Sequence, residues 1–127
     1  MDRSDFAGDL SGRVLGLAIE VHRETGRGLL KSVYERCLCL ELEAAGIPFA
    51  RQVLIPITYK SRRLDAGFRA DVVVANQLIV EVKCVESFVA SHEAQLLTYL
   101  SLSGIGVGLL LNFQAARMKD GIRRLVV

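Results

Sequence analysis

The sequence predicts an α/β domain with a mixed sheet flanked by helices, and three observations support this prediction. In the first 45 residues, apolar side chains recur at helical spacing. Between residues 53 and 84 they form short runs separated by turn residues, which is typical of strands. A further helical segment and two more apolar runs follow, so a later strand must join the sheet through a helical crossover.

The first two elements are expected to be helices. The pattern predicts a helix over Leu10–Arg23 with Ser11 as its N-cap. Glycines at 26 and 28 break it, and a second helix over Leu30–Ala45 stops at Gly46. The residues expected to face inward are Val14, Leu15, Leu17, Ala18, Ile19 and Val21 in the first helix, and Val33, Cys37, Leu38, Leu40, Leu42 and Ala45 in the second.

Strands are expected in the middle of the chain. Residues alternate over Val53–Thr58, which predicts a strand near a sheet edge because Pro56 cannot donate a ladder hydrogen bond. Lys60–Arg63 is expected to be a turn. The remaining predicted elements are strands over Phe68–Val74 and Leu78–Cys84 joined by a tight loop at Asn76 and Gln77, a helix over Ser91–Leu102, and strands over Val107–Phe113 and Ile122–Val127. The strand after that helix is expected to pair in parallel.

Size and composition indicate one domain over residues 1–127. The net charge of +2 implies no strong overall attraction to nucleic acid. The acidic, polar segment Met1–Leu10 lacks the pattern of a signal peptide, and no apolar run is long enough to span a membrane. Cys37, Cys39 and Cys84 are odd in number and lack metal-site spacing, which favours reduced thiols. We therefore expect a cytoplasmic protein without a membrane partner.

Three charged residues lie on two of the predicted strands. Asp71 heads a run of valines, where a carboxylate is costly unless it is paired or bound to a cation. Glu81 and Lys83 are two residues apart in a strand, so they share one face of the sheet. Carboxylate oxygens suit Mg²⁺ or Mn²⁺, which acidifies a bound water for attack on phosphorus, while Lys83 orients that water or neutralises charge. The alternative is a plain ion pair between Lys83 and a carboxylate.

A helix near these strands carries two more candidate residues. Gln95 and Tyr99 are four residues apart, so they share a helical face. Ser91 and His92 lie near the predicted helix N-terminus, where backbone N–H groups favour phosphate. Taken alone, Gln95 and Tyr99 are more typical of an ordinary polar stripe than of a functional motif.

The order of these residues resembles a known superfamily. Asp71, Glu81-x-Lys83 and Gln95-x-x-x-Tyr99 resemble the PD-(D/E)XK nucleases, in the RecB-like and lambda-exonuclease-like branch with a Q-x-x-x-Y helix. The chain also looks like the small bacterial GxxExxY family over Ala18–Glu24, Gly28–Glu35, Glu93–Leu100, Asn112–Phe113 and Lys119–Arg124. The resemblance covers nearly the whole chain. It implies a restriction-endonuclease-like αβββαβ core with an extra N-terminal helix, catalytic roles for the five residues, and an Mg²⁺ or Mn²⁺ cofactor.

The sequence departs from the G-x-x-E-x-x-Y motif at one position. Gly28 and Tyr34 are present, but Lys31 stands at the acidic position. In nucleases of this fold, an acidic residue of the first core helix commonly completes the metal site, and an ammonium there opposes metal binding. Glu35, one turn further on, is the predicted replacement ligand, and Glu20 is a second candidate. Alternatively, Lys31 and Glu35 form a surface pair.

Two functions remain open from the sequence. The first is hydrolysis of DNA phosphodiester bonds by a nuclease whose metal is held by Asp71, Glu81 and Glu35. The second is a catalytically inactive module on the same fold that binds nucleic acid, DNA rather than RNA, or that assembles as a homo-oligomer. The basic residues that either grip phosphates or form an ordinary surface are Arg51, Lys60, Arg62, Arg63, Arg69, Arg117, Lys119, Arg123 and Arg124.

Overall fold

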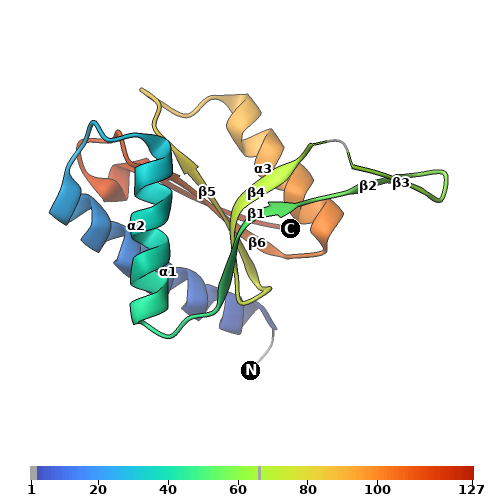
Figure 1. Ribbon diagram of the computed structural model, residues 1–127, viewed down its shortest axis with the longest axis horizontal. Coiled ribbons are helices and arrows are strands. Elements are labelled where there is room, and N and C mark those ends of the chain that lie inside the picture. The colour runs from blue at the N-terminus through green and yellow to red at the C-terminus, as the bar shows by residue number, and fades with distance from the viewer. Residues whose placement is uncertain (1–2, 66) are drawn as a thin grey trace.

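The chain forms a five-stranded mixed sheet with helices on both faces (Figure 1). The computed structural model describes residues 3–65 and 67–127. Its helices are α1 (Arg3–Thr25), α2 (Lys31–Ala44), α3 (Ala90–Ser103) and the 3₁₀ turn η1 (Met118–Gly121). Its strands are β1 (Phe49–Leu54), β2 (Ile57–Tyr59), β3 (Arg62–Leu64), β4 (Arg69–Val74), β5 (Leu78–Lys83), β6 (Val107–Asn112) and β7 (Ile122–Val126).

The strand order confirms the predicted fold class. The sheet runs β1-β4-β5-β6-β7, and every neighbouring pair is antiparallel except β5 and β6, which are parallel. The parallel pair is joined through α3, as the predicted crossover requires. The order α2, β1, β4, β5, α3, β6 is the expected αβββαβ core, and α1 is the extra N-terminal helix.

Two apolar clusters cover the two faces of the sheet. On one face, α1 and α2 pack through residues such as Val14 and Leu38 against β4, β5 and β6. On the other face, α3 packs through Leu96 and Leu100 against residues such as Val73. The central strands are buried almost throughout, which explains their continuous apolar runs. Within the described residues, no helix is long and apolar enough to cross a membrane.

The first helix differs from the prediction at its start. It begins at Arg3 rather than Leu10. Met1 and Asp2, the first residues of the segment predicted to lack a signal-peptide pattern, lie outside the described residues. Ser11 therefore lies inside the helix instead of capping it, and its Oγ accepts a hydrogen bond from Arg124 Nε at 3.1 Å. Val14, Ala18 and Val21 are buried as expected, whereas Ile19 is 43% exposed.

The second helix turns a different face inward from the one predicted. Tyr34, Glu35, Leu38, Cys39 and Leu42 are buried. Of the residues predicted to face inward, three are exposed, namely Val33, Leu40 and Ala45. The apolar residues of α2 span a wider arc than the helix can bury, so their spacing alone did not fix the buried face. The predicted stop is confirmed, because Gly46 has a left-handed φ of 71° and its N–H donates to Glu43 O at 3.0 Å.

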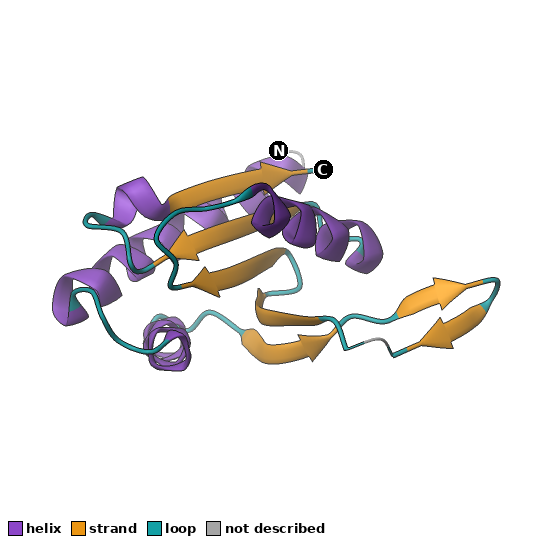
Figure 2. Ribbon diagram, turned by 90° about the horizontal axis from the view of Figure 1, so that it is seen from above, coloured by secondary structure: helices purple, strands orange, loops and turns teal. Residues whose placement is uncertain are grey.

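The predicted strand over Val53–Thr58 is two strands. β1 ends at Leu54, before Pro56, and β2 then begins a separate hairpin with β3. The predicted turn Lys60–Arg63 is also shorter, because only Lys60 and Ser61 form it. This hairpin projects away from the body of the molecule, beyond the ends of β1 and β4 (Figures 1 and 2).

Candidate functional site

The ends of β4 and β5 separate at the two predicted carboxylates. The pairing register of the two strands reaches Val72↔Val80 and stops one position before Asp71 and Glu81. There the backbone N–H of Asp71 donates to Glu81 Oε1 at 3.0 Å, and the N–H of Val82 donates to Asp71 Oδ2 at 2.9 Å. Side-chain oxygens thus replace the ladder bonds where the strands diverge. We call this point, formed by Asp71 and Glu81, the fork. The prediction that Asp71 and Glu81 lie together is confirmed, and both are buried, at 4% and 3% exposed.

Gln52 adds a third polar side chain that the sequence did not indicate. The register of β1 with β4 places it opposite Asp71, and its φ is +50°. A left-handed conformation costs a non-glycine residue about 1–3 kcal/mol. It lets Gln52 Nε2 donate to Glu35 Oε1 at 2.8 Å and to Asp71 Oδ1 at 3.4 Å. Gln52 therefore connects α2 to the carboxylate pair, and backbone strain at a polar network is a common mark of a functional site.

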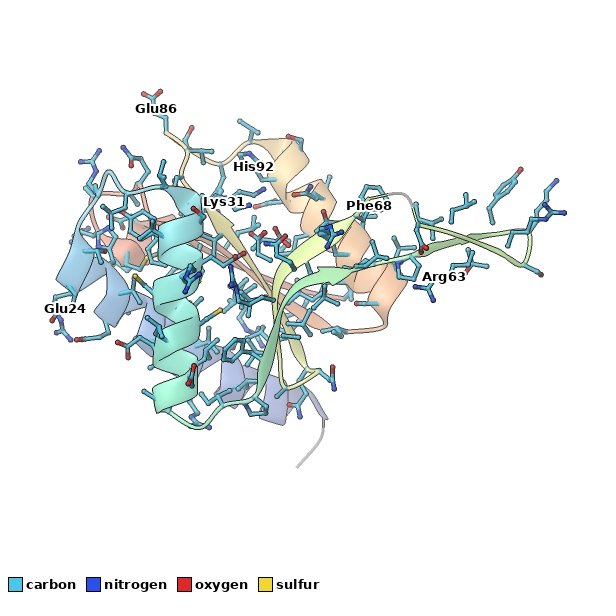
Figure 3. All side chains as sticks on the ribbon, in the orientation of Figure 1. Glu24, Lys31, Arg63, Phe68, Glu86 and His92 are labelled. Atoms are coloured by element: carbon cyan, nitrogen blue, oxygen red, sulfur yellow. The ribbon has the colours of Figure 1, made fainter. Side chains whose placement is uncertain are left out.

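Lys31 points from the first turn of α2 toward the carboxylates. Its Nζ lies 3.2 Å from Asp71 Oδ1, the oxygen that Gln52 also approaches. Figure 3 shows the lysine at the end of α2 that lies nearest α3 and the strand ends. The side chain of Lys31 is 46% exposed, whereas that of Asp71 is 6% exposed, so a buried carboxylate meets a cation that water still reaches. The residue at the expected acidic position thus supplies positive charge to the site.

Glu35 is buried but lies outside the Asp71–Glu81 pair. Its Oε2 accepts a hydrogen bond from Arg51 Nη2 at 2.8 Å, and its Oε1 accepts the one from Gln52. The alternative of a Lys31–Glu35 surface pair is wrong, because Glu35 is only 3% exposed and pairs with Arg51. Each oxygen of Glu35 accepts a hydrogen bond, and the side chain of Gln52 lies between this carboxylate and that of Asp71.

The residues on α3 reach the site from the other side of the fork. Lys83 Nζ donates to Gln95 Oε1 at 3.2 Å, which joins the end of β5 to α3. Tyr99 is 3% exposed, and its ring packs against Phe68 at a centroid distance of 5.8 Å. Burial, followed by the charge of Glu81, raises the pKa of the Tyr99 phenol above its usual 10, so the phenol stays neutral. Gln95 is placed to orient Lys83, whereas Tyr99 supports the site from within the core.

The electrostatics of the fork favour a cation. Burial, followed by the negative charge of Asp71, raises the pKa of Glu81 from 4.5 to about 8, and Lys83 opposes this only in part. At neutral pH the metal-free protein therefore holds Glu81 mostly protonated. Two buried carboxylates whose neighbours compensate their charge incompletely are a suitable donor set for a hard divalent ion.

The donor set fits such an ion with two carboxylates rather than three. Among the residues that the structure describes, no group of three or more His, Cys, Asp or Glu side chains is arranged to hold a metal. Asp71 and Glu81 supply hard oxygens, and Mg²⁺ commonly keeps several waters and takes one or two carboxylates. Lys31 is a competitor for the same Asp71 oxygen. Glu20, the other candidate acid, forms an ion pair with Arg23 on α1.

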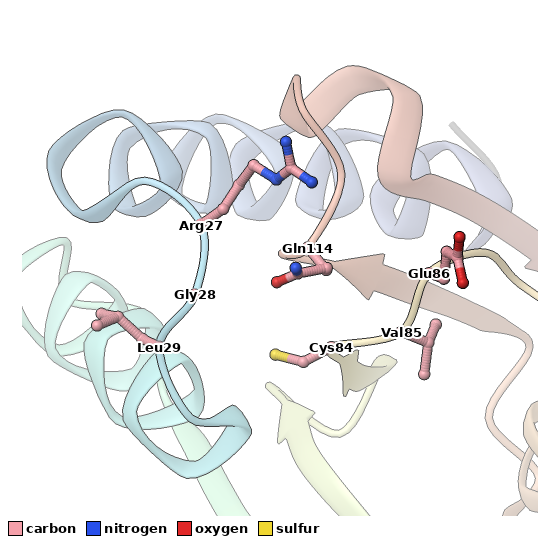
Figure 4. Close-up of a pocket in the computed structure, with 7 residues that line it drawn as sticks. All are labelled: Arg27, Gly28, Leu29, Cys84, Val85, Glu86 and Gln114. Atoms are coloured by element: carbon pink, nitrogen blue, oxygen red, sulfur yellow. The ribbon is translucent and has the colours of Figure 1, made fainter.

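A pocket of about 620 Å³ opens beside the site, at the ends of β5 and β6 (Figure 4). It is lined by the segments 27–29 and 84–86 and by Gln114. Arg27, Glu86 and Gln114 give it a polar lining of mixed charge. Burial raises the pKa of the Cys84 thiol on its wall, so this cysteine is a neutral packing group rather than a thiolate nucleophile.

Two residues of the motif resemblance have structural contacts next to this pocket. Tyr34 Oη donates to Gly26 O at 2.6 Å, and its ring stacks on Phe113 at 4.6 Å. Asn112 Nδ2 donates to Val85 O at 2.8 Å, and its Oδ1 accepts from the N–H of Val85 at 3.1 Å. Both side chains fix the loops around the pocket, which explains why the fold requires them.

The basic residues outside the β2–β3 hairpin form two groups. Arg51 and Arg69 lie on β1 and β4, next to the carboxylates, and Arg69 Nη1 donates to Gln52 O at 3.4 Å. The other group lies on or beside η1 and β7, at the opposite edge, where Arg117 pairs with Asp120. Of the basic residues expected either to grip phosphates or to form an ordinary surface, those on β1 and β4 therefore lie next to the carboxylates.

Comparison with known proteins supports the geometry. A family model described as the PD-(D/E)XK nuclease superfamily matches residues 8–125, which include both carboxylates, Lys83 and all three α-helices in whole or in part. No curated protein sequence and no solved structure gives a significant match. The family match, the mixed sheet with its parallel β5–β6 pair, and the forked carboxylates agree. The chain belongs to the PD-(D/E)XK nuclease superfamily.

Proposed function

We propose that this protein is a metal-dependent nuclease-like domain that hydrolyses DNA phosphodiester bonds, with activity weakened by Lys31. The observation that carries the proposal is the buried Asp71–Glu81 pair, with the cationic Lys83 held by Gln95 on the next element. PD-(D/E)XK nucleases generally use divalent metals, and here we assign Mg²⁺ or Mn²⁺ to Asp71 and Glu81. Glu35, the third candidate ligand, joins them only if it is released from Arg51 and Gln52. Within the superfamily we place the chain in the GxxExxY group and read Gln95 and Tyr99 as a Q-x-x-x-Y motif.

The residues of the fork prepare the chemistry. The N–H of Val82 holds one oxygen of Asp71, and the N–H of Asp71 holds one oxygen of Glu81, so both carboxylates are oriented before any ion binds. When bound, a divalent ion supplies an acidified water and neutralises charge on a phosphoryl oxygen. Lys83 shares a sheet face with Glu81 and orients the attacking water or balances the charge that develops on phosphate.

Lys31 modifies this arrangement. An ammonium 3.2 Å from Asp71 Oδ1 must move before the oxygen can bind a metal ion, and like charges close together in a partly desolvated site repel. We therefore expect weak metal affinity in the natural sequence. Lys31→Glu is expected to tighten Mn²⁺ binding at least about tenfold, since it removes a repulsion and adds an oxygen donor. Lys31→Ala separates the two effects, and isothermal titration with Mn²⁺ measures them.

Cleavage assays test the proposal directly. Purified protein with Mn²⁺ is incubated with linear, nicked and single-stranded DNA and with RNA. We expect cutting of DNA that is abolished by Asp71→Asn and Lys83→Ala and retained by Lys119→Ala, an exposed lysine on η1. Absence of cutting by both the natural protein and Lys31→Glu would refute the nuclease proposal.

A second candidate is a catalytically inactive module that binds nucleic acid or assembles with itself, and the Lys31–Asp71 ion pair favours it. It predicts salt-sensitive DNA binding that chelator does not change, whereas a gel shift that disappears with EDTA argues against it. We place either form in the cytoplasm, because all three cysteines are free thiols.

A further inference from the structure

The hairpin formed by β2 and β3 is the most exposed element of the described fold. Its two strands pair only with each other, as a separate two-stranded sheet. All of its residues are exposed except Ile57, which is half-buried. Figures 1 and 2 show it extending from the end of the body that bears β1 and β4. Isolated two-stranded hairpins are marginally stable in water, so a hairpin that projects from the body indicates a role other than stabilising the fold.

The charge of this hairpin indicates its partner. Lys60, Arg62 and Arg63 give it three cations within four residues, and Asp65 just beyond β3 is the nearest acid in sequence. Arg63 pairs with Asp65 at 3.1 Å, whereas Lys60 lies over the Tyr59 ring at 5.6 Å. Lys60 and Arg62 form no ion pair with any residue that the structure describes. We call residues 57–64 the basic ribbon.

The turn of the basic ribbon carries a lysine in a backbone conformation that lysine disfavours. Lys60 and Ser61 have φ values of 48° and 66°, the left-handed conformations of a tight hairpin turn. Asparagine and glycine adopt such turns at lower cost. A lysine at this position therefore places an ammonium at the turn of the projecting hairpin despite its backbone preference.

The ribbon continues the strands that bear the site. β1 carries Gln52 and leads into β2, while β4 carries Asp71 and follows β3. Lys60, at the tip, is eight residues after Gln52, so at about 3.3 Å per residue the tip lies at most about 26 Å from Gln52. Arg69 shares a strand face with Asp71 and lies between the two regions. In Figure 3, Arg63 lies out on the ribbon and Phe68 marks its base.

We propose that the basic ribbon is an arm that binds duplex DNA through its phosphates and major groove, and so extends the substrate-binding surface of the proposed nuclease site. A two-stranded ribbon fits the roughly 12 Å major groove but not the narrower minor groove. At about 3.4 Å per base pair, a duplex that lies over Gln52 and the carboxylates reaches the tip within about eight base pairs. The inference rests on nucleic acid as the substrate, and it assigns the ribbon to binding rather than to chemistry.

Binding without cleavage tests the arm. Fluorescence anisotropy with a labelled duplex of about 20 base pairs is measured in EDTA over a range of salt concentrations. We expect the double variant Lys60→Ala/Arg62→Ala to bind about tenfold or more weakly and to lower the salt slope by about 2, or about 0.9 per lost phosphate contact. Asp65→Asn is expected to bind more tightly, because it releases Arg63 from its ion pair.

A matched control removes the same charge elsewhere. Arg13→Ala/Arg36→Ala deletes two exposed arginines on α1 and α2, which lie at the other end of the molecule from the ribbon (Figure 1). Equal losses in the two double variants, no change in either, or no binding by the natural protein would each overturn the arm. So would a ribbon variant that changes the oligomeric state in light scattering and leaves DNA affinity intact.

The outcomes for the arm and for the nuclease proposal are separable. Ribbon-dependent binding without Mn²⁺-dependent cutting by either the natural protein or Lys31→Glu supports the arm and refutes the nuclease. Cutting with ribbon-independent binding refutes the arm alone. Asp65→Asn adds affinity rather than removing it, so the test does not depend on a variant that folds poorly.

Discussion

Replacing Glu81 by glutamine tests the electrostatics of the fork in the metal-free protein. Glutamine keeps an oxygen that can accept the hydrogen bond from the N–H of Asp71, now at 3.0 Å, but it cannot ionise. The pKa of Glu81 is about 8 in the folded chain, against 4.5 as its ordinary value. The substitution therefore removes a titrating group while changing the shape of the site very little.

The sign of the effect follows from which state holds the proton. Between pH 4.5 and about 8, the unfolded chain has lost the proton of Glu81 and the folded chain keeps it. The free energy of unfolding contributed by this group is therefore full below pH 4.5 and is lost as the pH rises toward 8. At about 1.4 kcal/mol per pH unit, the loss reaches about 3 kcal/mol between pH 5.5 and 7.5. Glu81→Gln is expected to lack this decline.

Urea unfolding in EDTA at several pH values measures the difference. The free energy of unfolding of Glu81→Gln should exceed that of the natural protein by an amount that grows with pH. Glu86→Gln, an exposed carboxylate in the loop after β5, is the matched control and should follow the natural protein. Parallel curves for the natural protein and Glu81→Gln between pH 5.5 and 7.5 would refute the reasoning, because the two proteins differ only in the group at position 81.

Three further substitutions test hydrogen bonding and packing elsewhere in the fold. Tyr34→Phe removes the 2.6 Å hydrogen bond to Gly26 O and is expected to lower the free energy of unfolding by about 1–2 kcal/mol, measured by urea denaturation. Gly121→Ala is expected to lower the melting temperature, because a Cβ there would lie 2.4 Å from the backbone oxygen of Asn112. Gly108→Ala should cost less than Gly121→Ala in the same thermal scan, because its Cβ meets only side-chain atoms, at 2.8 Å and beyond.

The parts of the fold that were predicted correctly are those that a short pattern determines. The valines after Asp71 and the run before Glu81 mark two buried strands, and the length of the segment between β5 and β6 requires a crossover helix. Because the two carboxylates lie on adjoining strands with fixed side-chain alternation, their proximity also followed from the sequence.

The rest depends on contacts between distant residues. Glu35 is buried because Arg51 and Gln52 on β1 donate hydrogen bonds to its carboxylate. The spacing of residues within α2 gives no information about these two partners. Gln52 itself was missed because its role needs a left-handed φ in a strand, which no spacing signals. The central part of the basic ribbon, Lys60–Arg63, was predicted to be a turn, because the three-residue strand β3 has no apolar alternation.

The fork explains why Asp71 and Glu81 alone do not establish activity. Each accepts a backbone N–H that the diverging strands leave without a ladder partner, so each is needed for folding whether or not an ion binds. The side chain of Lys83 makes no such hydrogen bond to the strand backbone, because among the described residues its Nζ bonds only to the side chain of Gln95. A cation held on the same sheet face as Glu81 by a second polar residue is difficult to explain by stability, since a half-exposed pair of this kind contributes little. The Lys83–Gln95 pair is therefore the feature that most favours chemistry at this fork, and Lys31 is the one that most opposes it.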